Sequence, residues 1–247
     1  MRLFLLLTLL LLTPVVSLAQ GGVVHYSHTF KILDGKGASN AVVEIGGQQN
    51  GEDYIQGPEH TTMSRTLVFN STTSLMHPSD VQSFEIGARP NWEYIDTMFV
   101  DFEKGTYSQW VEFNADPYLV KDQLPRVSWR LTDENRMYLG HRVVKATATI
   151  DSSVVEAWFS PDIPVPAGPG LYNRLPGLVL LVTHAAVGEV YAAESIDLAP
   201  PPPPIAPSTG REVSADRYNQ IKTSQLARSK RLYEKFMRQH GNLPDFP

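Results

Sequence analysis

The chain has no cysteine among its 247 residues. This absence excludes disulfide bonds, thiol nucleophiles and cysteine metal sites, so we expect the core and the hydrogen bonds alone to hold the fold. Apolar runs long enough to cross a membrane are also missing. The run Leu3–Leu12 is too short to span a bilayer as a helix.

The first 19 residues predict a secretory signal peptide. Arg2 supplies the positive charge, Leu3–Leu12 supplies the apolar region, and Ser17, Leu18 and Ala19 fit the small-x-small cleavage rule. We therefore expect residues 1–19 to be removed during export to the periplasm or the cell exterior. After cleavage we expect no transmembrane anchor.

Basic residues are scarce in most of the chain. Residues 20–207 hold 12 Lys and Arg against 22 Asp and Glu, whereas residues 208–247 hold 8 against 4. An acidic body repels phosphate backbones, which argues against a nucleic-acid partner.

Residues 20–198 show short β-branched and aromatic segments separated by turn residues, with no alternation of strands and helices. This pattern predicts roughly nine to eleven strands. The predicted fold class is mainly β, an antiparallel meander sheet curled into a half-barrel. Residues 199–210 are rich in proline and predict a stiff spacer.

Residues 211–241 predict an amphipathic basic helix, and residues 242–247 a short tail. Ser214 is a good N-cap and Gly241 suits the C-terminal stop. One helical face would carry the apolar residues, namely Tyr218, Ile221, Leu226, Leu232, Tyr233, Phe236 and Met237. The pattern favours a helix that packs back on the sheet or lies loosely tethered, ahead of one that binds a membrane surface or docks to another protein.

The segment from Trp158 to Val182 packs five prolines and three glycines between two apolar stretches. Proline fixes φ, and glycine permits backbone that other residues disfavour, so the segment specifies one rigid loop. Its pattern resembles the signature of the GLPGLI family of exported bacterial proteins. The motif positions that match best are Pro161, Ile163, Pro164, Gly168, Pro169, Leu175, Pro176, Gly177 and Leu178.

Two positions depart from that signature. Arg174 stands where the family has glycine, and Val179 where it has isoleucine. The arginine indicates either that this position needs no positive φ or that the turn has shifted. The resemblance implies an exported protein, and no particular activity.

The same segment offers candidate ligand contacts. Trp158, Phe159 and Tyr172 would rim an apolar cleft, with Asp162 and Arg174 as polar contacts. In the alternative interpretation the segment is an ordered crossover whose prolines cap the sheet, with Trp158 and Phe159 split between core and surface. The pattern favours the crossover.

No catalytic motif is recognisable, so we expect no catalytic residues, no cofactor and no metal site. His25 and His28 are three apart, which in a strand places them on opposite faces.

Three functions remain open. The favoured hypothesis is a non-enzymatic protein that binds an apolar ligand on the concave face of the sheet. The second is an envelope interaction protein that docks through its C-terminal helix. The third is a hydrolase that uses scattered carboxylates or histidines.

Overall fold

The computed structural model describes residues 21–31, 60–79, 96–113, 116–199 and 201–240. The predicted signal peptide, residues 1–19, and the predicted tail, residues 242–247, lie outside these ranges.

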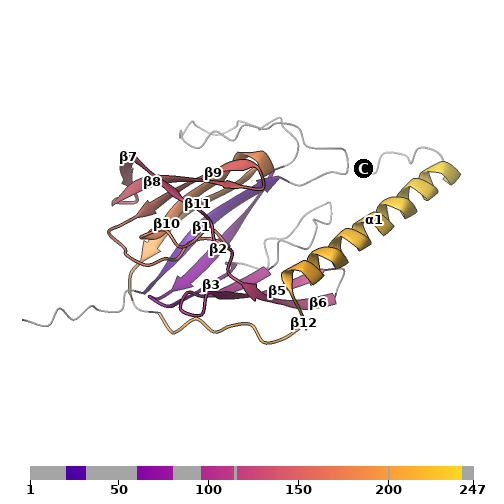
Figure 1. The fold of residues 1–247 in the computed structure, drawn as a ribbon, viewed down its shortest axis with the longest axis horizontal. Coiled ribbons are helices and arrows are strands. Elements are labelled where there is room, and N and C mark those ends of the chain that lie inside the picture. Colours follow the sequence, from indigo (N-terminus) through magenta and orange to yellow (C-terminus); the bar gives the residue numbers. More distant parts are fainter. Residues whose placement is uncertain (1–20, 32–59, 80–95, 114–115, 200, 241–247) are drawn as a thin grey trace, which may run out of the picture.

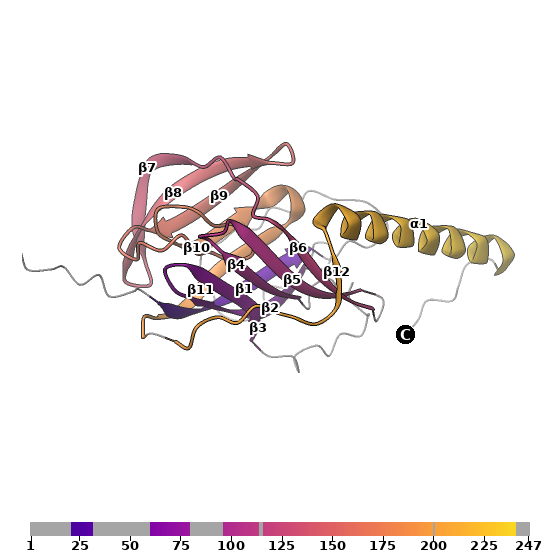
Figure 2. The ribbon, with the colours of Figure 1, turned by 60° about the horizontal axis from the view of Figure 1, so that its bottom comes forward.

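The described residues form one open sheet of twelve strands and a C-terminal helix (Figure 1). All pairings are antiparallel except the one between β12 and β6. The sheet order is β12-β6-β5-β4-β3-β2-β1-β11-β10-β9-β8-β7, and Figure 2 shows β7, β8 and β9 curling over the rest. The predicted fold class, a curled antiparallel sheet with a C-terminal helix, is confirmed. The strands are β1 (Gly22–Lys31), β2 (His60–Phe69), β3 (Thr73–Pro78), β4 (Asp96–Asp101), β5 (Thr106–Phe113), β6 (Asp116–Gln123), β7 (Arg130–Tyr138), β8 (His141–Ile150), β9 (Ser153–Ser160), β10 (Leu178–His184), β11 (Glu189–Asp197) and β12 (Arg211–Val213).

The first strand lies near the middle of the sheet. β1 pairs with β2 along its whole length and with β11 on its other side. From β1 the chain therefore adds β2 to β6 one after another on one side. It then crosses to the opposite edge of the sheet, and β7 to β11 lead strand by strand back to β1.

Side chains alternate across β1, as the period of a strand requires. Val24, Tyr26 and His28 are buried on the concave face, whereas His25 points outward and is exposed. The prediction that His25 and His28 lie on opposite faces is confirmed.

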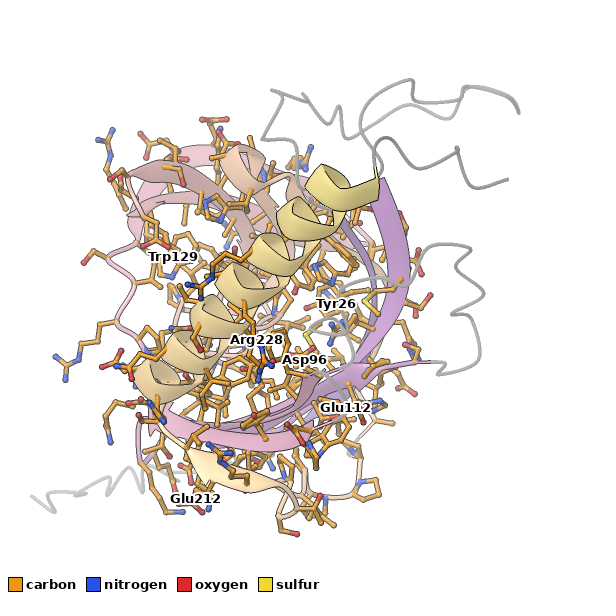
Figure 3. All side chains as sticks on the ribbon, turned by 90° about the vertical axis from the view of Figure 1, so that its right-hand side faces the viewer. Tyr26, Asp96, Glu112, Trp129, Glu212 and Arg228 are labelled. Atoms are coloured by element: carbon orange, nitrogen blue, oxygen red, sulfur yellow. The ribbon has the colours of Figure 1, made fainter. Side chains whose placement is uncertain are left out.

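Two apolar clusters occupy the concave face. The first consists mainly of residues on β1, β2, β8, β9, β10 and β11. The second consists mainly of residues on β4, β5, β6 and the helix. Figure 3 looks into the curve of the sheet, where Tyr26 and Asp96 lie inside and Glu212 lies outside.

The proline- and glycine-rich segment between β9 and β10 folds into the first cluster. Ile163, Val165 and Leu175 are buried there. The segment is fastened by backbone bonds, such as that from the Leu178 amide to the Ile163 carbonyl at 2.9 Å. The Tyr26 hydroxyl also donates to the Val179 carbonyl, at 2.5 Å. The prolines and glycines thus shape a loop that fills part of the curl.

Arg174 adopts the left-handed backbone conformation, with a φ of 65°. Of the two interpretations of this arginine, the one in which the position needs no positive φ is therefore wrong. Its amide donates to the Pro166 carbonyl at 2.9 Å, so the turn geometry that glycine favours is kept although the residue is arginine.

Helix α1 (Ala215–His240) begins four residues later than residue 211, where we predicted its start. The preceding residues Arg211–Val213 instead form β12, because they pair in parallel with Tyr118–Val120 of β6. Ser214 caps the helix as predicted, since its hydroxyl accepts from the Arg217 amide at 3.3 Å.

The first turns of α1 pack on the sheet, whereas the rest extends away from it (Figure 1). Tyr218 and Ile221 are buried in the second apolar cluster. In the part of the chain that the structure describes, no helix is long and apolar enough to cross a membrane.

A methyl group at Gly168 should break the loop between β9 and β10. An added Cβ would lie 2.1 Å from the Tyr172 carbonyl oxygen, so we expect Gly168→Ala to lower the free energy of unfolding by about 3 kcal/mol. Urea unfolding measures this. Gly140→Ala is the control, because nothing lies within 4 Å of its added Cβ and only backbone strain of about 1 kcal/mol remains. Equal losses for the two variants would contradict the close packing of the loop.

Candidate functional site

A cleft of about 800 Å³ opens on the concave face of the sheet. Residues of both apolar clusters line it, among them Met76 and Met98. Strands β1, β2, β4, β5 and β11 provide most of its floor, while Tyr172 and the first turns of α1 add to its walls. We call it the main cleft.

One half of the floor is organised around the carboxylate of Glu189. His28 Nε2 lies 3.1 Å from Glu189 Oε1, and the Tyr172 hydroxyl donates to Oε2 at 2.6 Å. The ring of Tyr191 stacks on the imidazole of His28, with centroids 3.9 Å apart. Three side chains thereby fix the carboxylate in one orientation.

This carboxylate is held in its ionised form. Burial alone would raise the pKa of Glu189, but hydrogen bonds from His28, Tyr172 and Tyr191 outweigh it and lower the pKa below its ordinary value. Burial also lowers the pKa of His28, against the opposing effect of Glu189. His28 is therefore the neutral imidazole at pH 7, and its Nε2 carries the proton because a carboxylate only accepts. Its Nδ1 is buried, and none of the described residues forms a hydrogen bond with it.

The hydrogen bonds continue from Tyr172 toward the start of β9. Tyr172 gives its one proton to Glu189, so its oxygen accepts from His184 Nδ1 at 3.1 Å. His184 Nε2 then lies 2.5 Å from Ser153 Oγ. A single chain of side-chain contacts therefore runs from His28 through Glu189, Tyr172 and His184 to Ser153.

The other half of the floor is an ion pair. Arg65 Nη1 lies 2.5 Å from Asp96 Oδ1, and its side chain is only 5% exposed. The Gln109 amide donates to Asp96 Oδ2 at 2.6 Å. Burying such charges costs several kcal/mol unless they are paired and hydrogen-bonded, and this pair meets both conditions.

Together the two halves present two carboxylates, an amide and a guanidinium beside tyrosine rings. This polar floor carries one negative charge in excess, because Arg65 balances Asp96 whereas Glu189 is ionised beside a neutral His28. It suits a ligand with many hydrogen-bonding groups. Within the described ranges, no group of three or more His, Asp or Glu side chains lies close enough to hold a metal ion.

The five residues that the sequence suggested as ligand contacts do not lie together in the structure. Trp158 lies on the outer face under the guanidinium of Arg136, 4.3 Å from its ring centre. Phe159 is buried in the first apolar cluster. Asp162 is half exposed, 3.9 Å from Arg142.

Tyr172 alone of the five lines the main cleft, and Arg174 lines a second, smaller cleft. The pattern of the sequence did not predict a site at the floor residues His28, Arg65, Asp96, Gln109 and Glu189. Strand alternation holds a signal for two of them, because His28 follows Val24 and Tyr26, and Arg65 stands between Met63 and Leu67. Polar residues at apolar positions of a strand mark such a site.

A profile of the family described as "N-glycanase peptide, N-terminal domain" matches residues 60–198. The chain belongs to this family. The earlier resemblance to the GLPGLI family is wrong, because the matched region contains the whole proline- and glycine-rich segment and the strands around it. A short loop motif reflects the conformation of one loop, which unrelated proteins can share. The profile instead matches the sequence of most strands of the sheet.

The fold is similar to that of PNGF-II, solved in two crystal forms. The C2 form aligns with a TM-score of 0.54 and 17% identity, over 82% of this chain and 32% of that one. The P21 form aligns with a TM-score of 0.54 and 18% identity, over 82% and 33%. The chain thus spans about a third of the length of these structures, and at this identity the likeness shows the fold alone. A comparison with curated proteins gave no match.

The family overturns the favoured function as well. We expected a non-enzymatic GLPGLI protein with an apolar ligand or an envelope partner, but the chain belongs to an N-glycanase domain family. The cleft also disagrees with an apolar ligand, since its floor carries an ion pair and an ionised carboxylate.

Acid should weaken the fold through His28. The unfolded histidine binds a proton near pH 6.5, whereas burial lowers the pKa of the folded one. Stability is then full above pH 6.5 and falls as the pH drops below it, by at most about 1.4 kcal/mol per pH unit. Below about pH 4.5 the lowered pKa of Glu189 adds a loss in the same direction.

Urea unfolding at pH 7, 6 and 5 measures this loss. His28→Gln keeps a donor to Glu189 but does not titrate, so it should flatten the decline between pH 6.5 and 5. Ser27→Ala, on the opposite face of β1, changes no titrating group and should keep the wild-type decline. An unchanged slope in His28→Gln would show that other groups cause it.

Proposed function

We propose that this chain binds the glycan of N-linked glycoproteins in the main cleft and serves as a recognition domain in an N-glycanase-type system. The observation that carries the proposal is the rigid polar floor formed by Glu189, Asp96 and Arg65 on a sheet. The family supplies the class of ligand, because its name denotes a domain of an N-glycanase.

The chemistry of a sugar fits this floor. Each sugar hydroxyl both donates and accepts a hydrogen bond, so it needs acceptors such as carboxylates and donors such as amides and guanidinium groups. The floor offers both kinds, with tyrosine rings for the apolar faces of the sugar. Its volume of about 800 Å³ lies within the range of ordinary ligand sites.

The ionisation state of Glu189 favours binding over acid catalysis at this position. A general acid must hold a proton near neutral pH, which requires a raised pKa. The pKa of Glu189 is lowered, so its carboxylate accepts hydrogen bonds from a ligand at pH 7. Bonds to a charged acceptor are the stronger ones.

The helix completes the cleft from outside the matched region. The profile ends at residue 198, yet Ala215, Tyr218 and Asn219 line the cleft. We propose that these residues contact the part of the ligand nearest the open side. Export through the predicted signal peptide, residues 1–19, would bring the domain to glycoproteins outside the cytoplasm.

Glu189→Gln should weaken glycan binding. Loss of the charged acceptor removes about 1.5–3 kcal/mol of hydrogen bonding, so we expect the Kd for a neutral released N-glycan to rise at least about tenfold. Isothermal titration calorimetry measures this Kd, and thermal unfolding shows whether the variant is folded.

Glu194→Gln is the matched control, because Glu194 lies exposed on the same strand and should leave the Kd unchanged. Asp96→Asn provides a second floor variant with the same expected direction. Failure of the wild-type protein to bind any N-glycan would refute the proposed function.

A further inference from the structure

A second cleft, of about 480 Å³, adjoins the main one. Three segments line it: the turn between β4 and β5 with Lys104 and Gly105, the chain after β6 with Arg126, and the loop before β10 with Arg174. Because these three basic side chains come from separate parts of the chain, we call this space the basic cleft.

The positive charge in the basic cleft is only partly neutralised. Lys104 pairs with Asp101 at 2.8 Å, and Glu103 is the acidic residue in the lining. Among the residues that the structure describes, neither Arg126 nor Arg174 makes an ion pair. Gathering like charges costs electrostatic free energy, which a bound anion would recover.

The backbone at Arg174 carries a second cost. Its φ of 65° disfavours any residue with a Cβ, and glycine would avoid this strain. Strain of this kind clusters at functional sites, and outside the β-hairpin turns, where Leu139, Asp151 and Ser152 also have a positive φ, Arg174 is the remaining example among the described non-glycine residues. The guanidinium lies against the β4–β5 turn, where a Cβ added to Gly105 would be 3.0 Å from Arg174 Nη2. Glycine at this turn thus leaves room for the guanidinium.

Arg126 lines both clefts. A ligand in the main cleft that extends past Arg126 would therefore place its end among the basic residues. Figure 3 shows Trp129, which follows Arg126 closely in the chain, at the side of the concave space.

We propose that the basic cleft is a subsite for the anionic group of an acidic glycan whose neutral part occupies the main cleft. The group is a carboxylate, sulfate or phosphate, whose oxygens match the fork of N–H donors on arginine. This inference rests on the proposed function and names the substrate class within it. Because the cleft is partly open to solvent, the preference should weaken as salt is added.

The test compares a neutral N-glycan with the same glycan ending in sialic acid, whose carboxylate is the anion. Calorimetry at low salt should show the wild-type protein binding the acidic glycan about tenfold more tightly than the neutral one. In Arg174→Gly this preference should fall to about twofold or less, with the neutral glycan bound as before. Glycine suits the backbone at residue 174, so this variant is expected to fold.

Arg126→Gln, a substitution of an exposed residue, should reduce the preference in the same way. Arg130→Gln is the control: it removes an equal charge from an exposed residue outside both clefts and should keep the preference. Equal binding of the two glycans by wild type, or a preference that survives in Arg174→Gly and Arg126→Gln, would overturn the subsite and leave the proposed function standing. Binding of neither glycan would overturn both.

Discussion

The pairing of β1 with both β2 and β11 is the constraint on which the molecule depends. It places the first strand near the middle of the sheet, so the two halves of the meander spread from it in opposite directions. Because β1 lies there, His28 meets Glu189 although 161 positions separate them in the chain. The same arrangement places Arg65 on the neighbouring strand, within reach of Asp96. The order of the strands in the sheet therefore brings together the residues that form the floor of the main cleft.

Charged side chains on the buried face of a sheet cost free energy that apolar side chains at the same positions would not. Each buried charge loses hydration, and the loss must be offset locally by partners with good geometry. Here Asp96 has Arg65 and Gln109, while Glu189 has His28 and Tyr172. Most of these partners lie on strands that hydrogen bonds hold in register. The side chains that compensate the buried charges are therefore already in position when the sheet has formed. A floor already satisfied in this way can exchange contacts with a ligand at little cost in ordering.

Features set by local sequence were predictable. Alternation along β1 placed His25 and His28 on opposite faces, and Ser214 caps α1 as its residue type indicates. β12 was missed because its three residues are held by pairing with β6 rather than by their own pattern. A concave binding face was expected, but its polar floor was missed for the same reason, since no local spacing joins the strands that form it. The loop motif misled the family assignment, because prolines and glycines describe a backbone shape rather than the sheet into which the loop folds.

The helix shows how a segment outside the matched region can become part of the site. β12 pairs with β6, and the Ala215 amide donates to Asp122 Oδ2 at 3.0 Å. These contacts fix the start of α1, and burial of Tyr218 and Ile221 holds its first turns on the second apolar cluster. The wall that the helix gives to the cleft therefore depends on the edge of the sheet. The remaining turns extend away from the sheet (Figure 1), and the helix residues that line the cleft, among those the structure describes, lie between Ala215 and Lys222.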